Sequence, residues 1–263
     1  MVNRQPMRWY RTMWASLAFS CFLGMSLSEF SDNAFAQGTG IELTLTQAIA
    51  FGRTADVQKL IDKGTDVNTP SQPDGPPPLE MASLLGSPEV VKLLLDRGAR
   101  VNDHWGASKK TALSLAAGAG RVEVVAILLE AGAEIDAADS FGQTALMEAC
   151  RAKRIPVVEL LMDRGANHKI EDIVGGTVLH AMALDGDVSV MTALVKKVAD
   201  VNSKQRDGLT PLMVAAVTDR ADMVDLLLKS GADVTIRDNA GLTALDMANG
   251  DAVKSILSEH RKK

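Results

Sequence analysis

The chain has 263 residues, a length typical of one or two domains. Its 28 Lys and Arg residues against 33 Asp and Glu give a formal net charge of −5, which argues against a general nucleic-acid binder with a basic face. The balance of 46% hydrophobic and 23% charged residues excludes disorder over most of the chain. Two cysteines, Cys21 and Cys150, are too few for a disulfide scaffold or a zinc cluster.

The first 36 residues have the pattern of an export signal. The stretch Met13–Leu27 is uncharged and largely apolar, and the basic residues before it are Arg4, Arg8 and Arg11. Ala34-Phe35-Ala36 places small residues at the two positions that a signal peptidase recognises. We expect cleavage after Ala36, with Ser26-Leu27-Ser28 as a second, weaker site.

Two other fates of this segment stay open. An uncleaved signal anchor would use the 16 uncharged residues from Thr12 to Leu27, which are short for a membrane span of about 20 residues. A lipoprotein signal would use Cys21, but the bulky Phe19 fits the preceding motif poorly. We expect the cleaved form, residues 37–263, to have no membrane span and to be periplasmic or secreted.

A Thr-x-Leu pattern recurs along the rest of the chain with a constant spacing of 33 residues. Its five copies are Thr111-Ala112-Leu113, Thr144-Ala145-Leu146, Thr177-Val178-Leu179, Thr210-Pro211-Leu212 and Thr243-Ala244-Leu245. Two weaker copies precede them at intervals of 34 residues, Leu43-Thr44-Leu45 and Pro77-Pro78-Leu79. Nineteen residues after the leucine most copies place a glycine, namely Gly64, Gly98, Gly132, Gly165 and Gly231. Val198 holds this place in the fifth copy, where a left-handed backbone would strain a β-branched residue.

The residues between these anchors predict two short helices in each repeat. In the third repeat the segment 124–129 has an apolar stripe at helical spacing, and Gly132 can end that helix in a left-handed conformation. Pro88 and Pro156 fall in the first turn of their helices, where a missing N–H costs nothing. Each repeat is too small to bury its own apolar face, so stability must come from stacking on neighbours.

This pattern resembles the ankyrin repeat over about residues 41–260. The copies that carry the resemblance best are the turn Asp139–Leu146, the segment Gly231-Ala232-Asp233-Val234, and His180 at the histidine position of the family motif. The resemblance implies an all-α ankyrin-repeat solenoid of seven helix-turn-helix units with short β-hairpin fingers, residues 37–263. The expected repeats are 41–72, 73–106, 107–138, 139–171, 172–204, 205–237 and 238–263, with the first and last acting as caps.

No cluster of titratable residues points to catalysis, a metal, a cofactor or a small-molecule substrate. We expect His180 to order its turn by hydrogen bonding rather than to act as a ligand or base. Cys150 is expected to be a buried small hydrophobic residue. The nearby Arg151, Lys153 and Arg154 leave a reactive thiol as the alternative.

In the family that this sequence resembles, partners contact the fingers and the exposed ends of the first helices. The resemblance therefore names candidate binding residues in the fingers, which are Trp105, Phe141, Gln143, Ile173, Val174, Arg206, Leu209 and Leu242, and at helix ends, which are Arg151 and Asp185. Six of the finger residues are apolar and can either form an exposed stripe or pack on each other.

The resemblance implies a monomeric, non-catalytic protein-interaction module that is exported from the cytoplasm and binds an unidentified protein partner. The alternative is a secreted factor that binds a target protein on another cell or host. A third alternative, from a different class, is an enzyme whose site is built on the solenoid.

Overall fold

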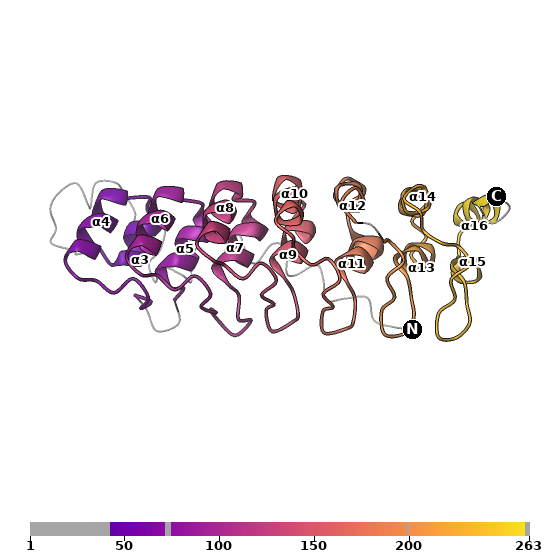
Figure 1. The fold of residues 1–263 in the computed structure, drawn as a ribbon, viewed down its shortest axis with the longest axis horizontal. Coiled ribbons are helices and arrows are strands. Elements are labelled where there is room, and N and C mark those ends of the chain that lie inside the picture. The colour runs from indigo at the N-terminus through magenta and orange to yellow at the C-terminus, as the bar shows by residue number, and fades with distance from the viewer. Residues whose placement is uncertain (1–42, 72–74, 199, 261–263) are drawn as a thin grey trace, which may run out of the picture. The chain divides into compact units, whose positions relative to one another are not determined.

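The computed structural model describes residues 43–71, 75–198 and 200–260. The predicted signal peptide, residues 1–36, lies outside the described residues. The chain divides into two compact parts, Met1–Pro78 and Leu79–Lys263. Along both parts, every predicted repeat contains one pair of short helices (Figure 1).

The first part contains one helix pair, α3 (Leu45–Ala50) and α4 (Thr54–Asp62), which pack against each other. Thr44 begins α3 with a capping box, in which the Gln47 amide donates to the Thr44 hydroxyl at 3.3 Å and the Gln47 side chain accepts from the Thr44 N–H at 3.0 Å. The side chains of Ile49 and Val57 are fully buried in this pair.

The second part consists of six helix pairs, one per repeat, in the described residues. They are α5 (Pro78–Leu85) with α6 (Pro88–Asp96), α7 (Ala112–Ala119) with α8 (Val122–Glu130), α9 (Ala145–Arg151) with α10 (Ile155–Asp163), α11 (Val178–Asp185) with α12 (Val188–Val195), α13 (Pro211–Val217) with α14 (Ala221–Lys229), and α15 (Ala244–Met247) with α16 (Asp251–His260).

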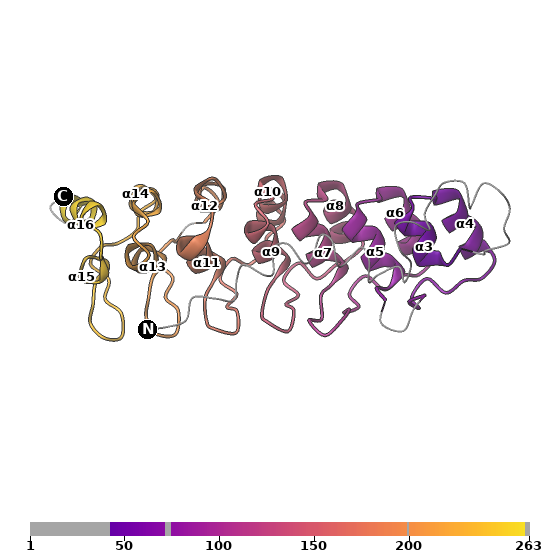
Figure 2. The same ribbon diagram turned by 180° about the vertical axis from the view of Figure 1, so that it is seen from behind.

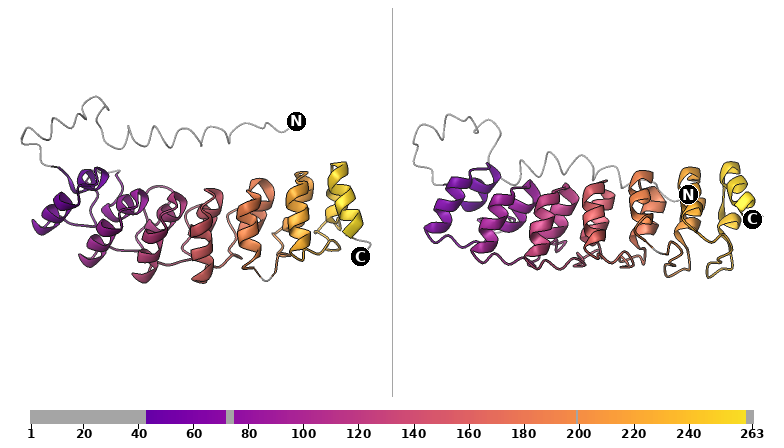
Figure 3. Two further views of the ribbon diagram at one scale, coloured as in Figure 1. Left: turned by 90° about the horizontal axis from the view of Figure 1, so that it is seen from above. Right: turned by 45° about the horizontal axis from the view of Figure 1, so that its top comes forward.

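The two helices of a repeat lie in two different rows of the second part. First helices pack on first helices, as α7 on α9 and α11 on α13, and second helices pack on second helices, as α8 on α10 and α12 on α14. Figures 1 and 2 show both rows, with the loops between repeats projecting from one edge beneath the first helices. Figure 3 shows the second helices following one another in chain order.

The Thr-x-Leu pattern marks the start of the first helix in the third to seventh repeats. Thr111 caps α7 by accepting from the Ser114 amide at 3.2 Å, and the leucine two residues later, Leu113, is 1% exposed. Thr144, Thr210 and Thr243 cap α9, α13 and α15 in the same way. The threonine therefore sets where the helix begins, and the leucine anchors its first turn in the core.

Arginines before the second helices connect successive repeats, a feature that the sequence analysis missed. Arg121 donates from Nε to the Leu84 carbonyl at 3.2 Å, and Arg154 donates to the Gly118 carbonyl at 3.2 Å. Each side chain crosses a glycine of the preceding repeat, since a Cβ on Gly120 would lie 2.8 Å from Arg154 Cδ. The glycine turns thus leave the space that the arginine of the next repeat fills.

The predicted β-hairpin form of the fingers is wrong. In the described residues extended pairing is limited to two isolated bridges, Trp105 with Lys110 and Ala138 with Thr144. Inside each turn an aspartate side chain accepts hydrogen bonds from backbone amides, as Asp139 does from Phe141 and Gln143. These amides are therefore not available for the backbone hydrogen bonds between two paired strands. The fingers are tight turns rather than strand pairs.

The expected strain at Val198 is also wrong, although the left-handed glycine at the equivalent Gly132 is confirmed, with φ of +87°. Val198 does not have a positive φ. The helix α12 ends at Val195, and the Val198 amide donates to the Leu194 carbonyl at 3.1 Å. Its side chain is 8% exposed, so Val198 belongs to the core of the repeat.

Candidate functional site

The fingers of the second part are closed by their own aspartates. Asp139 accepts from the amides of Phe141 at 2.8 Å and Gln143 at 3.0 Å through one carboxylate oxygen. Asp172 and Asp238 accept from the matching amides of their fingers at 2.8–3.0 Å. These aspartates satisfy backbone donors that a bare loop would leave to water, and they hold each turn in one shape.

Neighbouring fingers are joined backbone to backbone. The Ile173 amide donates to the Phe141 carbonyl at 3.2 Å, and the Asn239 amide donates to the Asp207 carbonyl at 3.1 Å. Gly142 makes the close approach possible, because a Cβ there would lie 2.7 Å from the Asp172 Cα. The fingers of neighbouring repeats in the second part therefore support one another.

The structure decides which apolar finger residues are exposed. Phe141 is 53% exposed, Ile173 59%, Val174 74% and Leu242 43%. Trp105 and Leu209 are half-buried. Trp105 exchanges two backbone hydrogen bonds with Lys110, at 2.8 and 3.0 Å, which holds it at the base of its finger. Four of the six predicted apolar residues are thus exposed, and the sixth-repeat finger between Val174 and Leu242 exposes Arg206 and Asp207 instead.

The polar candidate residues fall into separate places. Gln143 is half-buried and donates to the Asp172 carboxylate of the next finger at 3.3 Å. Arg206 lies 3.8 Å from Glu171 as an exposed ion pair. Arg151 is paired with Glu148, whereas Asp185 is exposed at the end of α11. The structure does not gather these four side chains into one cluster.

Glu148 is the charged residue that the sequence analysis missed. It is 5% exposed, and its carboxylate pairs with both Lys110 of the preceding finger and Arg151 on its own helix. Burial raises the pKa of Glu148, but the hydrogen bonds and charges of Lys110 and Arg151 outweigh burial, so the net shift is downward. The signal available in the sequence was a glutamate at a repeat position held by Leu115, Ala181 and Val214 elsewhere.

His180 orders its turn as the sequence analysis expected. Its Nδ1 lies 2.9 Å from the Thr177 hydroxyl, and its Nε2 lies 3.0 Å from the Leu209 carbonyl of the next finger. Burial lowers the pKa of His180, which favours the neutral ring that this arrangement needs. The histidine is therefore a link between the fifth and sixth repeats.

The Cys150 thiol is buried. Burial raises the pKa of Cys150 to about 12, and the residue is 1% exposed, so Cys150 is the buried small residue that the sequence predicts rather than a thiolate at neutral pH. Among the described residues, His, Cys, Asp and Glu side chains form no group of three that could hold a metal ion. None of the described helices is long and apolar enough to cross a membrane.

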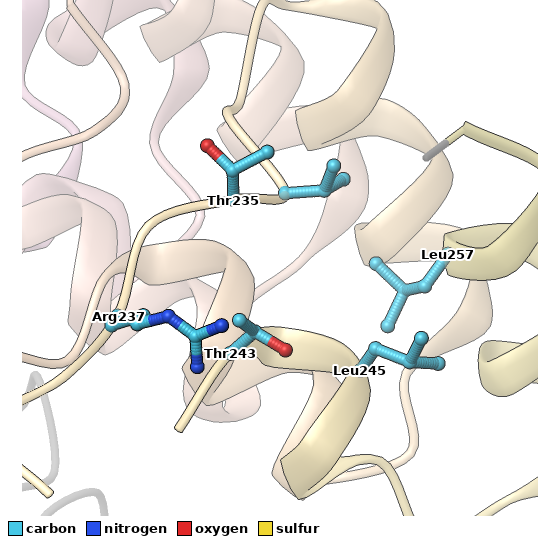
Figure 4. Close-up of a pocket in the computed structure, with 6 residues that line it drawn as sticks. Thr235, Arg237, Thr243, Leu245 and Leu257 are labelled. Atoms are coloured by element: carbon cyan, nitrogen blue, oxygen red, sulfur yellow. The ribbon is translucent and has the colours of Figure 1, made fainter. Parts of the chain in front are cut away.

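A hollow between the sixth and seventh repeats is too small for a substrate. Figure 4 shows Thr235, Arg237, Thr243, Leu245 and Leu257 around it, and Val234 completes the lining. Its volume is about 60 Å³, against about 300–1,000 Å³ for typical ligand pockets. The Arg237 guanidinium donates to the Gly241 carbonyl at 2.6 Å, within its own finger. This hollow offers no small-molecule site.

Comparison with known proteins decides the family. A family model described as ankyrin repeats in three copies matches residues 45–139, 100–172 and 179–263. The chain belongs to the ankyrin repeat family. No curated protein sequence matches it.

Two solved ankyrin repeat domains resemble this one over most of its length. The ankyrin repeat domain of Bcl-3, described as a unique member of the IkappaB protein family, is 26% identical with a TM-score of 0.75, covering 82% of this chain and 98% of that one. The human ASB11 ankyrin repeat domain is 27% identical with a TM-score of 0.69, covering 83% of this chain and 97% of that one. The predicted all-helical ankyrin fold is confirmed.

Ankyrin repeats are in general protein–protein interaction modules, and the family and its structural neighbours are non-catalytic binding scaffolds. In this ankyrin domain the fingers expose the apolar side chains of Phe141, Ile173, Val174 and Leu242.

Proposed function

We propose that this ankyrin repeat protein is a non-catalytic module that is exported from the cytoplasm and binds a protein partner through its fingers and the exposed ends of its first helices. The observation that carries the proposal is the finger row, in which the backbone is held by hydrogen bonds while Phe141, Ile173, Val174 and Leu242 stay exposed. Exposed apolar side chains on a held backbone can bind without the entropic cost of ordering a loop.

Export is proposed from the sequence of the first 36 residues. The basic residues before the apolar stretch Met13–Leu27 and the motif Ala34-Phe35-Ala36 support a cleaved signal and a periplasmic location. N-terminal sequencing of the protein from the periplasm of a Gram-negative host should begin at Gln37. An intact Met1 in the cytoplasmic fraction would contradict export. Recovery from the culture medium would favour the secreted alternative.

Partner capture from a periplasmic extract tests the binding surface. Phe141→Ala should weaken binding of the captured partner by about 2 kcal/mol, the size of effect seen for aromatic anchors at interfaces. Trp105→Ala should weaken binding too, but it should also lower the melting temperature, because Trp105 is half-buried in its finger. Lys92→Ala on the second helix α6 is the control and should change neither quantity. Capture that is insensitive to Phe141→Ala would contradict the finger surface.

A further inference from the structure

The finger and first helix of the fifth repeat, and the end of the first helix of the sixth repeat, expose apolar side chains. We call this surface the apolar patch; it consists of Ile173, Val174, Ala181, Leu184 and Val217. All five are exposed, with Leu184 at 49% and Val217 at 45%. Ala181 and Leu184 lie three residues apart on α11 and so share one face of that helix.

The patch replaces a charged network found one repeat earlier. Arg151 in the fourth repeat holds the position of Leu184 and Val217, and Glu148 holds the position of Ala181. In the fourth repeat Glu148 pairs with both Arg151 and Lys110. At these positions the fifth and sixth repeats therefore expose apolar side chains, whereas the fourth repeat has an ion pair.

The spacing of the patch matches an α-helix laid across the repeats. The helices α11 and α13 pack against each other, and Leu184 and Val217 hold equivalent positions on them. Packed helices lie about 8–10 Å apart, and seven residues of an α-helix rise about 10 Å. Side chains at positions i and i+7 of one bound helix can therefore contact Leu184 and Val217 respectively.

The net charge at the edge of the patch is negative. Asp185 follows Leu184, and Asp219 lies two residues after Val217; both are exposed. The Asp219 carboxylate lies over Gly250 of the seventh repeat, at the side of Val217 that faces that repeat. Within the described residues neither carboxylate group takes part in a hydrogen bond or ion pair.

Of the nearby cations, Lys153 pairs with Asp187 at 2.9 Å, and Arg206, which lies against Gly175 of the finger, pairs with Glu171 at 3.8 Å. Arg220 keeps its charge, because it donates to the neutral Met182 carbonyl at 3.3 Å. The two carboxylates therefore face one uncompensated guanidinium, which leaves a net negative charge.

We propose that the apolar patch binds an amphipathic, basic α-helix of a protein partner, with large aliphatic side chains on Leu184 and Val217 and Lys or Arg side chains paired with Asp185 and Asp219. This inference rests on the proposed function and names the class of partner. Recognition of a helix by anchors at i, i+3, i+4 and i+7 is a general binding mode, and the opposite charges align the helix along the row of repeats.

Fluorescence anisotropy with two labelled synthetic peptides tests the inference. One has leucine at i, i+3, i+4 and i+7 with lysine elsewhere, and the other replaces every lysine by glutamate. The wild-type protein should bind the Leu/Lys peptide and not the Leu/Glu peptide. The double variant L184A/V217A should bind the Leu/Lys peptide about tenfold more weakly or worse. Its melting temperature should be unchanged, since both side chains are exposed.

Charge reversal separates local pairing from the net charge of −5. D185K/D219K should lose the Leu/Lys peptide and gain the Leu/Glu peptide. The matched control D96K/E130K has the same net charge with both changes on second helices, and it should keep the wild-type preference. Leu84 is exposed and holds in the second repeat the position that Leu184 holds in the fifth, so L84A should keep full affinity for the Leu/Lys peptide.

Three results would overturn the inference. The first is Leu/Lys affinity unchanged in L184A/V217A, and the second is equal loss of affinity in D96K/E130K and D185K/D219K. The third is patch-dependent binding to vesicles of anionic lipid without any peptide binding, which would assign the patch to a membrane surface. A captured partner that needs Phe141 but binds L184A/V217A like wild type would preserve the proposed function and overturn only this inference.

Discussion

The buried carboxyl of Glu80 on α5 should make the stability of the protein depend on pH. Glu80 is 2% exposed, and its Oε1 has no hydrogen-bond partner in the described residues. Burial, with a smaller contribution from the charge of Asp103, raises the pKa of Glu80 from 4.5 to about 7. The folded chain therefore keeps this proton at pH values where the unfolded chain has lost it.

The sign and size of the effect follow from that pKa. Between 4.5 and about 7 the folded state binds more protons than the unfolded state, so the free energy of unfolding falls as pH rises. At about 1.4 kcal/mol per pKa unit, the shift changes the free energy of unfolding by about 3 kcal/mol. This stabilisation is fully present below pH 4.5 and is lost above about pH 7. Glu148 and Asp187 have lowered pKa values, so their contributions are lost only at lower pH.

Urea unfolding of wild type and Glu80→Gln at about pH 5 and about pH 8 measures this effect. The neutral glutamine should remove the fall in stability between about pH 5 and about pH 8, and the variant should be more stable than wild type at the higher pH. The variant should keep a rise in stability with pH, because the lowered pKa values of His168 and His180 make the unfolded state bind more protons than the folded state near their ordinary value of 6.5. Glu123→Gln, at an exposed carboxyl in the first turn of α8, is the control and should follow wild type. An unchanged pH dependence in Glu80→Gln would refute the assignment to Glu80.

Two further predictions concern backbone positions and are checked by thermal unfolding. Val198→Gly should lower stability by about 1–3 kcal/mol, because it removes a buried side chain from a backbone that is not left-handed; a raised melting temperature would contradict this. Gly132→Ala should lower the free energy of unfolding by about 1–2 kcal/mol, which is the strain of a left-handed backbone at a residue with a Cβ. No steric clash adds to this strain, since a Cβ there meets nothing within 4 Å. Gly142→Ala should cost clearly more, because its Cβ would lie 2.7 Å from the Asp172 Cα, and equal losses would contradict the finger contact.

The amino-acid sequence by itself determined the repeat and the helices. The threonine cap, the leucine two residues later and the glycine after the second helix each act on the backbone or side chains within a few residues of their own position, as Thr111, Leu113 and Gly132 show. Pro88 and Pro156 lie in the first turns of α6 and α10, as expected. These signals are local, so their outcome does not depend on which repeat comes next.

Only the tertiary structure decided which surface residues are available. Phe141 and Trp105 are both aromatic finger residues, yet Phe141 is exposed whereas Trp105 is half-buried beside Lys110. Glu148 forms an ion pair with Lys110, which lies 38 residues earlier in the chain. Val198 avoids a left-handed backbone because its helix ends early at Val195. Each outcome depends on groups that separate turns or repeats bring together, and the period of 33 residues carries no information about how those particular side chains meet.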